Sequence, residues 1–234
     1  MPTTTAAGPR FQPASDQSLL VYFGDRITLD SHRQVVRLLR LLQSEPVAGI
    51  RNLNPAYCSL LILFDPLRFT HDDLEAILRS YLGRLQTVPV PETREMEIPV
   101  CYGGDFGPDL ADVCALHGMT PSQVIELHSS ADYIVYFLGF VPGFAYMGEL
   151  PDALVTPRLA VPRRSVPSGS VGIAGSQTGV YPFSTPGGWR LLGRTPIKMF
   201  RSDETALSFL TIGDRVRFTP ISPEQFAVLE KAQR

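Results

Sequence analysis

The sequence predicts an α+β protein made of a small N-terminal α+β domain, residues 1–90, and a C-terminal domain, residues 91–234, built as a closed or nearly closed β-barrel. Three observations lead to this prediction. Strand and helix patterns alternate in the first ninety residues. A stretch with two prolines and several charges, TVPVPETREMEIPV at residues 87–100, then marks a boundary. Most of the remaining sequence is a series of short strands broken by glycine and proline.

The first domain contains two strand signals and two helix signals. Apolar runs predict strands at residues 18–23 (SLLVYF) and 57–65 (YCSLLILFD). Between residues 31 and 44 the apolar side chains recur with helical spacing, which predicts an amphipathic helix. A second helix is expected to begin after Thr70 as its N-cap and to stop at Gly83. Helices would therefore cover a small sheet.

The second domain begins with a strand after the boundary and two helices. A short helix is expected at residues 110–116, and Thr120 followed by Pro121 predicts the start of another that ends near His128. Ser222 is expected to cap a last helix at residues 223–231. The strands expected between them are YIVYFL (133–138), SVGIA (170–174), TGVYPF (178–183), WRLLG (189–193) and DRVRFTPI (214–221).

Bulk charge argues against nucleic-acid or membrane-surface binding. The 21 lysines and arginines nearly balance the 23 aspartates and glutamates, leaving a formal net charge of -2. No apolar run is long enough to span a bilayer, and the start MPTTTAAGPRFQP lacks the apolar region of a secretory signal. A cytoplasmic location is expected.

The cysteines and histidines predict no metal site. The three cysteines form no close pair, which fits reduced thiols. A set of Cys101, Cys114, His117 and His128 matches no common zinc spacing.

Glycine is concentrated in the second domain, where ten of the 19 glycines lie between residues 139 and 193. A phosphate-binding P-loop requires a lysine that this segment lacks. A dinucleotide fingerprint requires a following helix, and no helix signal follows Gly169, Gly172 and Gly175. Glycines in such strands mark corners, bulges or close approach of the backbone.

Aromatic residues accompany these glycines and favour a small-molecule pocket. The stretch LGFVPGFAYMG, residues 138–148, is expected to place aromatic side chains on an exposed glycine-proline loop. Arginine, glutamine, threonine and further aromatic residues come after it. Aromatic walls with a few polar donors are typical of a ligand pocket.

The same stretches resemble the carboxyltransferase C/D-type domain family. The matching motifs are CYGGDFGPDLADV, VIELH, YIVYFLGFVPGFAYMG, PRRSVPSGSVGIAGSQTGVYPFSTPGGWRLLGRTP and GDRVRFTPIS. NPAYCSLLILFDPL and SDQSLLVYFGDRI extend the resemblance into the first domain. It therefore covers nearly the whole chain, and it implies that the barrel is cyclophilin-like.

The resemblance implies an activity that needs partners: the ATP-dependent hydrolysis of 5-oxo-L-proline to L-glutamate by a 5-oxoprolinase complex. Family members act with a carboxyltransferase-like companion, the C subunit, and those of 5-oxoprolinase act also with an A subunit. ATP is expected to bind to the complex rather than to this chain alone. No biotin is expected on this chain, because Lys198-Met199 is only half of the Met-Lys-Met setting of a biotinylated lysine.

Two other functions remain open: inhibition of a sensor histidine kinase, and a carboxyltransferase or hydrolase role in urea and allophanate metabolism. Family members include proteins of both kinds. Prolyl isomerisation does not follow from a cyclophilin-like barrel, because a shared fold does not transfer a site.

Several residues are candidates for the site. His128 ends the motif VIELH and is the candidate for acid–base catalysis or for orienting the substrate, although a helix-end histidine can instead bond to backbone carbonyls. Arg163 can bind a carboxylate or phosphate, or form a surface ion pair. Gln177 and Thr178 can hydrogen-bond an amide, or simply join two strands. The other expected substrate-binding residues, for which barrel packing or a strand-end charge is the alternative, are Tyr136, Phe140, Phe144, Tyr181, Trp189 and Arg194.

Overall fold

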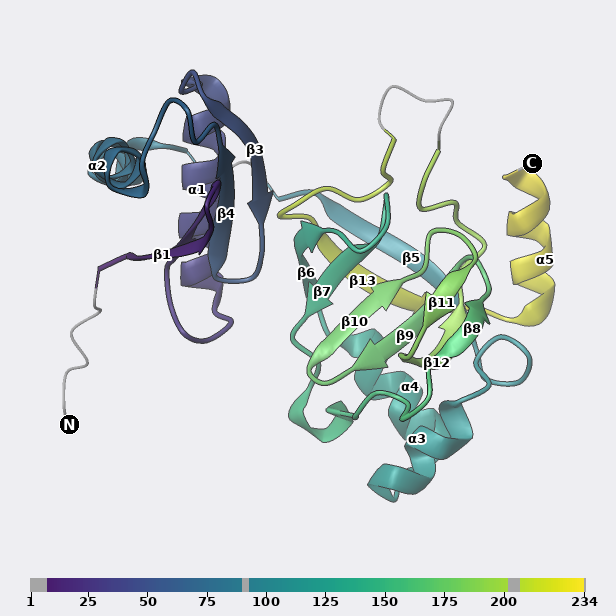
Figure 1. Ribbon diagram of the computed structural model, residues 1–234. Coiled ribbons are helices and arrows are strands. Elements are labelled where there is room, and N and C mark those ends of the chain that lie inside the picture. The colour runs from purple at the N-terminus through teal and green to yellow at the C-terminus, as the bar shows by residue number, and fades with distance from the viewer. Residues whose placement is uncertain (1–7, 90–92, 202–206, 234) are drawn as a thin grey trace. The chain divides into compact units, whose positions relative to one another are not determined.

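The computed structural model describes residues 8–89, 93–201 and 207–233 (Figure 1). The chain forms two compact units, Met1–Glu92 and Thr93–Arg234, and each is described by itself. The boundary predicted between residues 90 and 91 lies outside the described residues.

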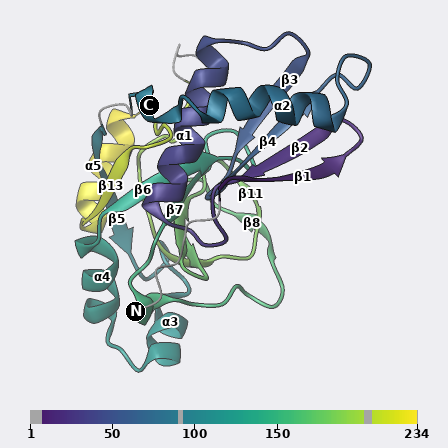
Figure 2. The ribbon, with the colours of Figure 1, turned by 90° about the vertical axis from the view of Figure 1, so that its left-hand side faces the viewer.

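The first unit is a four-stranded antiparallel sheet with the strand order β1-β2-β4-β3. Figure 2 looks onto the helices α1 and α2 that cover one face of this sheet. The elements are β1 Arg10–Ser15, β2 Ser18–Tyr22, α1 Leu29–Ser44, β3 Ile50–Pro55, β4 Ser59–Phe64, α2 His71–Leu82 and the short helix η1 Leu85–Thr87.

Capping side chains fix where the two helices begin. The Thr28 hydroxyl accepts the N–H of Ser31, so α1 begins at Leu29 rather than at residue 31. Thr70 forms a capping box with Asp73 ahead of α2, which confirms the predicted N-cap. The two predicted strands are confirmed as β2 and β4. Strands β1 and β3 were not predicted, because both lie at sheet edges and have few buried side chains.

The core of this unit lies between α1 and the central strands. Val35 and Leu38 of α1 and Val21, Leu60 and Ile62 of β2 and β4 are fully buried. The strand residues alternate with less buried neighbours, as expected for a sheet with one covered face.

The second unit is a closed seven-stranded barrel, which confirms the predicted α+β fold with a C-terminal barrel. The strands follow one another as β10-β7-β6-β13-β5-β12-β9, and β9 pairs with β10 to close the ring. Only β13 and β5 are parallel among these described neighbours. Strands β8 and β11 pair with each other in a separate two-stranded ribbon. The strands are β5 Glu95–Tyr102, β6 Tyr133–Leu138, β7 Ala145–Gly148, β9 Ser170–Ala174, β10 Gln177–Val180, β12 Arg190–Arg194 and β13 Arg215–Pro220, with β8 Arg163–Val166 and β11 Thr185–Gly187 in the ribbon.

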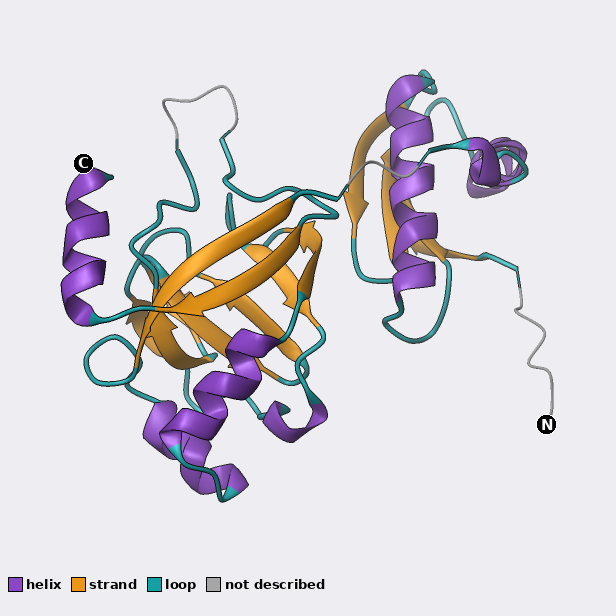
Figure 3. Ribbon diagram, turned by 180° about the vertical axis from the view of Figure 1, so that it is seen from behind, coloured by secondary structure: helices purple, strands orange, loops and turns teal. Residues whose placement is uncertain are grey.

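Three predicted helices accompany the barrel (Figure 3). Thr120 and Ser222 each form a capping box, with a proline in the first turn of the helix that follows. Gly118, with φ 64°, ends the helix before Thr120 in the left-handed conformation. The helices are α3 Leu110–His117, α4 Pro121–Ser130 and α5 Pro223–Ala232, and another short helix, η2, spans Asp152–Leu154.

The segment 138–148, predicted as an exposed loop, is a loop at residues 139–144 and a strand at its end. Ala145–Gly148 forms β7, which pairs with β6 and β10. Phe144, expected on the loop surface, is 1% exposed. Strand β7 was not predicted, because it follows a run of glycines and a proline, which usually indicates a loop. Prolines on either side of β8, and the proline and glycine within β11, had the same effect.

No helix in the described part of the chain has the length and apolar character needed to cross a membrane. Cys58, Cys101 and Cys114 are free thiols.

Candidate functional site

A cleft of about 220 Å³ opens on the outside of the barrel, where the β6–β7 turn meets β11. It is called the aromatic cleft below. Its lining residues are Phe140, Phe144, Tyr146, Arg158, Pro162, Tyr181, Pro186, Gly187, Gly188 and Trp189.

Phe144 is the centre of the aromatic cleft. Its ring lies edge-on to those of Tyr146, Tyr181 and Trp189, at centroid separations of 4.9, 5.2 and 5.4 Å. Edge-to-face contacts of this kind are favourable because the positive edge of one ring meets the negative face of another. The barrel therefore brings three predicted site residues, Phe144, Tyr181 and Trp189, into one wall.

Phe140 stands at the mouth of this cleft. Its ring is 58% exposed and lies 5.6 Å from that of Phe144. Its φ of 66° is in the left-handed region, where a tight turn is closed by a 2.7 Å hydrogen bond from the Val141 N–H to the Gly139 carbonyl. A bulky residue held in this conformation is strained, and such strain is most often retained at functional sites.

Two glycines face each other beneath the aromatic rings. Gly172 on β9 pairs with Gly179 on β10. A β-carbon at Gly179 would lie 3.1 Å from both the Phe144 and Trp189 rings, and one at Gly172 would lie 3.2 Å from the Trp189 β-carbon. The rings can approach the sheet because these strands carry no side chain there.

Tyr181 is fixed against the ribbon. A β-carbon at Gly187 would overlap the Tyr181 hydroxyl and lie 2.8 Å from its ring. The same hydroxyl is hydrogen-bonded by the backbone of Trp189. Burial raises the pKa of Tyr181, so the phenol stays neutral and protonated at pH 7.

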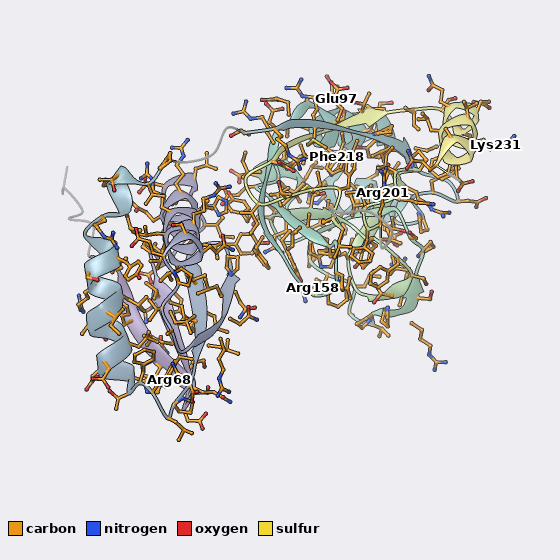
Figure 4. The ribbon with its side chains drawn as sticks, turned by 90° about the horizontal axis from the view of Figure 1, so that it is seen from above. Arg68, Glu97, Arg158, Arg201, Phe218 and Lys231 are labelled. Atoms are coloured by element: carbon orange, nitrogen blue, oxygen red, sulfur yellow. The ribbon has the colours of Figure 1, made fainter. Side chains whose placement is uncertain are left out.

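Arg158 has the only charged side chain among the lining residues, and Figure 4 shows it at the surface of the barrel unit. Within the described part of the chain, its side chain forms no hydrogen bond or ion pair. Burial raises the pKa of Tyr146 and Tyr181; the charge of Arg158 opposes both rises, and that of Arg163 also opposes the rise at Tyr181. Arg158 is not among the predicted site residues.

Arg163 does not line the aromatic cleft. Its Nη2 lies 2.5 Å from Oδ1 of the buried Asp109, whose Oδ2 accepts the Leu191 N–H at 2.7 Å. Arg163 was predicted to bind the carboxylate or phosphate of a ligand, but its partner in the structure is the carboxylate of Asp109. This ion pair joins the ribbon to β12.

Arg194 and Gln177 also lie outside the cleft lining. Arg194 Nε donates to the Ser168 carbonyl at 2.8 Å, and its guanidinium lies over the Phe226 ring. Gln177 begins β10 and pairs with Ala174. Both positions correspond to the structural alternatives considered for these residues.

Tyr136, Thr178 and His128 are buried and do not line the cleft. Tyr136 is 3% exposed, and burial followed by the charge of Glu149 raises its pKa to about 12. His128 and Thr178 are both 0% exposed and bond to each other inside the barrel. Since side chains alternate along a strand, Thr178 meets His128 on the inner face of β10 while Gly179 meets the aromatic rings on the outer face. The strand itself separates His128 from the cleft.

The hydrogen bonds of His128 assign its tautomer. Thr178 donates its one hydroxyl proton to the Gly172 carbonyl, so it accepts at 2.9 Å from Nε2–H of His128. Nδ1 is then the acceptor of the neutral ring, and the Tyr102 hydroxyl donates to it at 2.7 Å. Burial lowers the pKa of His128 to about 3, in keeping with a neutral imidazole. This geometry gives no support to the predicted acid–base role.

The comparisons place the chain in a family. Residues 9–210 match the family model described as carboxyltransferase domain, subdomain C and D. The chain belongs to this carboxyltransferase family. It is 37% identical to the B subunit of 5-oxoprolinase from Bacillus subtilis (strain 168), covering 93% of this chain and 95% of that protein. It is 45% identical to the B subunit of 5-oxoprolinase from Escherichia coli O157:H7, covering 83% and 88%.

A solved structure shows the same fold. The urea amidolyase of Kluyveromyces lactis matches 96% of this chain and 15% of that chain with a TM-score of 0.78. At 19% identity, this likeness concerns the fold alone.

In this carboxyltransferase-family chain, the site differs from the predicted set in a consistent way. The predicted aromatic residues Phe140, Phe144, Tyr181 and Trp189 line the cleft. Of the predicted polar residues, Arg163 forms an ion pair with the protein, and His128, Thr178 and Arg194 form hydrogen bonds within it. The lining residues that were missed are Tyr146, Arg158, Pro162, Pro186, Gly187 and Gly188. The stretch that follows LGFVPGFAYMG contains Arg158, but nothing local distinguishes it from Arg163 and Arg164.

Among the described residues of this family member, no three His, Cys, Asp or Glu side chains are grouped so that they could hold a metal ion. His117, one of the four residues considered as a zinc set, bonds instead through Nε2 to the Thr156 hydroxyl at 2.9 Å.

Gly187→Ala is expected to disturb the aromatic cleft, whereas Gly188→Ala is expected to be tolerated. The first β-carbon would displace Tyr181, at a cost of about 1–3 kcal/mol in unfolding free energy. The second would make ordinary contact with Pro162 at 3.5 Å. Urea unfolding followed by tryptophan fluorescence measures both; equal stability of the two variants would contradict the packing argument.

Arg163→Met is expected to destabilise the barrel unit by about 2–3 kcal/mol, because Asp109 stays buried without its cation. Arg215→Met is the matched control. The Arg215–Glu95 pair is exposed, with 45% and 70% of the two side chains accessible, so its loss is expected to change stability by less than about 1 kcal/mol. Chemical denaturation compares the two variants, and similar losses would show that the buried pair has no special weight.

Acidification is expected to weaken the barrel unit through His128. Between about pH 6.5 and pH 3 the unfolded chain binds a proton at this residue that the folded chain does not. The unfolding free energy should therefore fall as the pH falls, with a contribution of about 1.4 kcal/mol per pH unit. His128→Gln should be less stable at pH 7 but should show a shallower pH dependence in urea titrations. An unchanged slope in the variant would rule out this contribution.

Proposed function

We propose that this chain is the B subunit of a 5-oxoprolinase, which hydrolyses 5-oxo-L-proline to L-glutamate with ATP as the driving force. The observation that carries the proposal is identity of 37% and 45% to proteins of that name, over most of the length of each. The aromatic cleft supports it, since it offers an apolar wall and one cation to a small ligand.

The chemistry explains why a shielded site is needed. A five-membered lactam is a poor electrophile, and activation of its amide oxygen makes it reactive toward water. A site that holds the ring among aromatic side chains limits premature contact with solvent. In this proposal the lactam packs against the exposed Phe140 and the half-buried Tyr146, with the buried rings of Phe144 and Trp189 behind them.

ATP does not fit the aromatic cleft. Its volume of about 220 Å³ is below the range of about 300–1,000 Å³ typical of ligand pockets, and a nucleotide is a large ligand. One arginine among its lining residues cannot balance a triphosphate. We infer that ATP binds elsewhere than in this cleft, and we propose the assembled complex as its site.

The partners in this proposal are a carboxyltransferase-like companion, the C subunit, together with the A subunit of the same enzyme. Their presence in the proposal rests on the likeness to B subunits of 5-oxoprolinase. A pocket completed by a neighbouring chain also accounts for a cleft that is open on its own.

The other two functions have weaker support. The likeness to the Kluyveromyces lactis urea amidolyase concerns the fold and gives no argument for a urea or allophanate substrate. No described feature specifically favours binding to a histidine kinase.

Co-expression with the A and C subunits tests the proposal. The purified complex is expected to form glutamate and ADP from 5-oxoproline and ATP, and omission of this chain should abolish that turnover. His128→Gln in the same complex tests the acid–base role. If His128 acts in catalysis, turnover should be lost even in a complex of the variant that remains folded and assembled. A well-folded complex without turnover, together with tight binding of this chain to a sensor kinase, would overturn the proposal in favour of the regulatory function.

A further inference from the structure

The aromatic cleft combines an apolar wall with one cation that has no partner among the described residues. Several arginines of the barrel unit pair with protein carboxylates, as Arg94 does with Asp214 and Arg217 with Asp132. Arg158, by contrast, forms no ion pair or hydrogen bond through its side chain within the described residues. A guanidinium that the fold leaves unpaired beside aromatic rings is suited to an anionic ligand.

The backbone around Arg158 is held in place on both sides. Thr156 forms an isolated β-bridge with Gly175, and the Pro157 carbonyl accepts Arg190 Nε at 3.1 Å. On the other side, the Leu159 N–H donates to the Gly188 carbonyl at 2.8 Å. Arg158 therefore projects from a fixed segment, which lowers the entropic cost of holding a ligand.

Charge and size restrict the ligand class. One arginine balances one negative charge, whereas a phosphate ester carries close to two. The volume of about 220 Å³ admits a compact molecule. The exposed ring of Phe140 and the half-buried ring of Tyr146 offer apolar contact to a ligand ring, and the buried rings of Phe144 and Trp189 support them from behind.

We propose that Arg158 binds the carboxylate of a small ring-bearing carboxylic acid whose ring packs against the aromatic wall. The identification of this acid as 5-oxoproline rests on the function proposed above. The preference for a carboxylate rests on Arg158 alone and is independent of that function. Arg158 is thereby a substrate-binding residue, and it also sets which end of the lactam points toward the mouth of the cleft.

Trp189 provides a direct test, because it is the only tryptophan of the chain and forms part of the cleft wall. The full-length chain is titrated with three ligands while tryptophan fluorescence is followed: 5-oxo-L-proline, its neutral carboxamide, and cyclopentanecarboxylate. The variants are Arg158→Gln and, as a matched control, Arg164→Gln, which removes an exposed charge that does not line the cleft. Thermal unfolding checks that both variants remain folded.

The expected result is that Arg158→Gln weakens binding of 5-oxoproline about 10- to 100-fold, while Arg164→Gln leaves it unchanged. The carboxamide should bind wild type and Arg158→Gln equally and weakly. Equal affinity of wild type and Arg158→Gln for the acid, or no binding of either acid to wild type, would overturn the proposal.

The third ligand separates this proposal from the proposed function. Arg158-dependent binding of cyclopentanecarboxylate without binding of 5-oxoproline would support the carboxylate site and count against the 5-oxoprolinase assignment. If the complex instead turns over 5-oxoproline equally well with and without Arg158→Gln, the 5-oxoprolinase assignment is supported and the role of Arg158 is overturned.

Discussion

Close packing of aromatic rings against a strip of sheet without side chains shapes the candidate site of the barrel unit. Gly172 and Gly179 lie opposite each other on neighbouring strands; a β-carbon at either would crowd Trp189, and one at Gly179 would also crowd Phe144. In the same way, the absence of a side chain at Gly187 leaves space for the ring and hydroxyl of Tyr181. The glycine-rich segment is therefore neither a phosphate loop nor a plain series of corners. It is the floor of an aromatic cleft.

Buried polar groups fix the inner side of this floor. There the chain of hydrogen bonds from Tyr102 through His128 and Thr178 ends on the Gly172 carbonyl. A buried network satisfied in this way makes a structure rigid. Elsewhere in the unit, the pair of Asp109 and Arg163 ties the ribbon to β12. The result is a preformed wall with a single charge at its edge, which suits the binding of a small anion better than it suits nucleotide chemistry.

Much of the fold could be predicted because its signals are local. Caps at Thr70, Thr120 and Ser222 placed three helices, and apolar runs placed the central strands. The signals failed where glycine and proline occur within strands, as in β7, and where an edge strand has mostly polar residues, as in β1. In both cases the pairing partner, rather than the segment's own composition, determines the structure.

The α+β fold with a C-terminal barrel could be predicted from the sequence, because periodicity, capping and turn residues act over a few positions. Which polar side chains are left available to a ligand could not be predicted in this way. Arg158 and Arg163 differ little in sequence, yet among the described residues one lies unpaired beside the cleft and the other is bound to Asp109. His128 likewise proved to be sealed inside the barrel. Pairing and burial depend on residues far apart in the chain, so no local pattern encodes them.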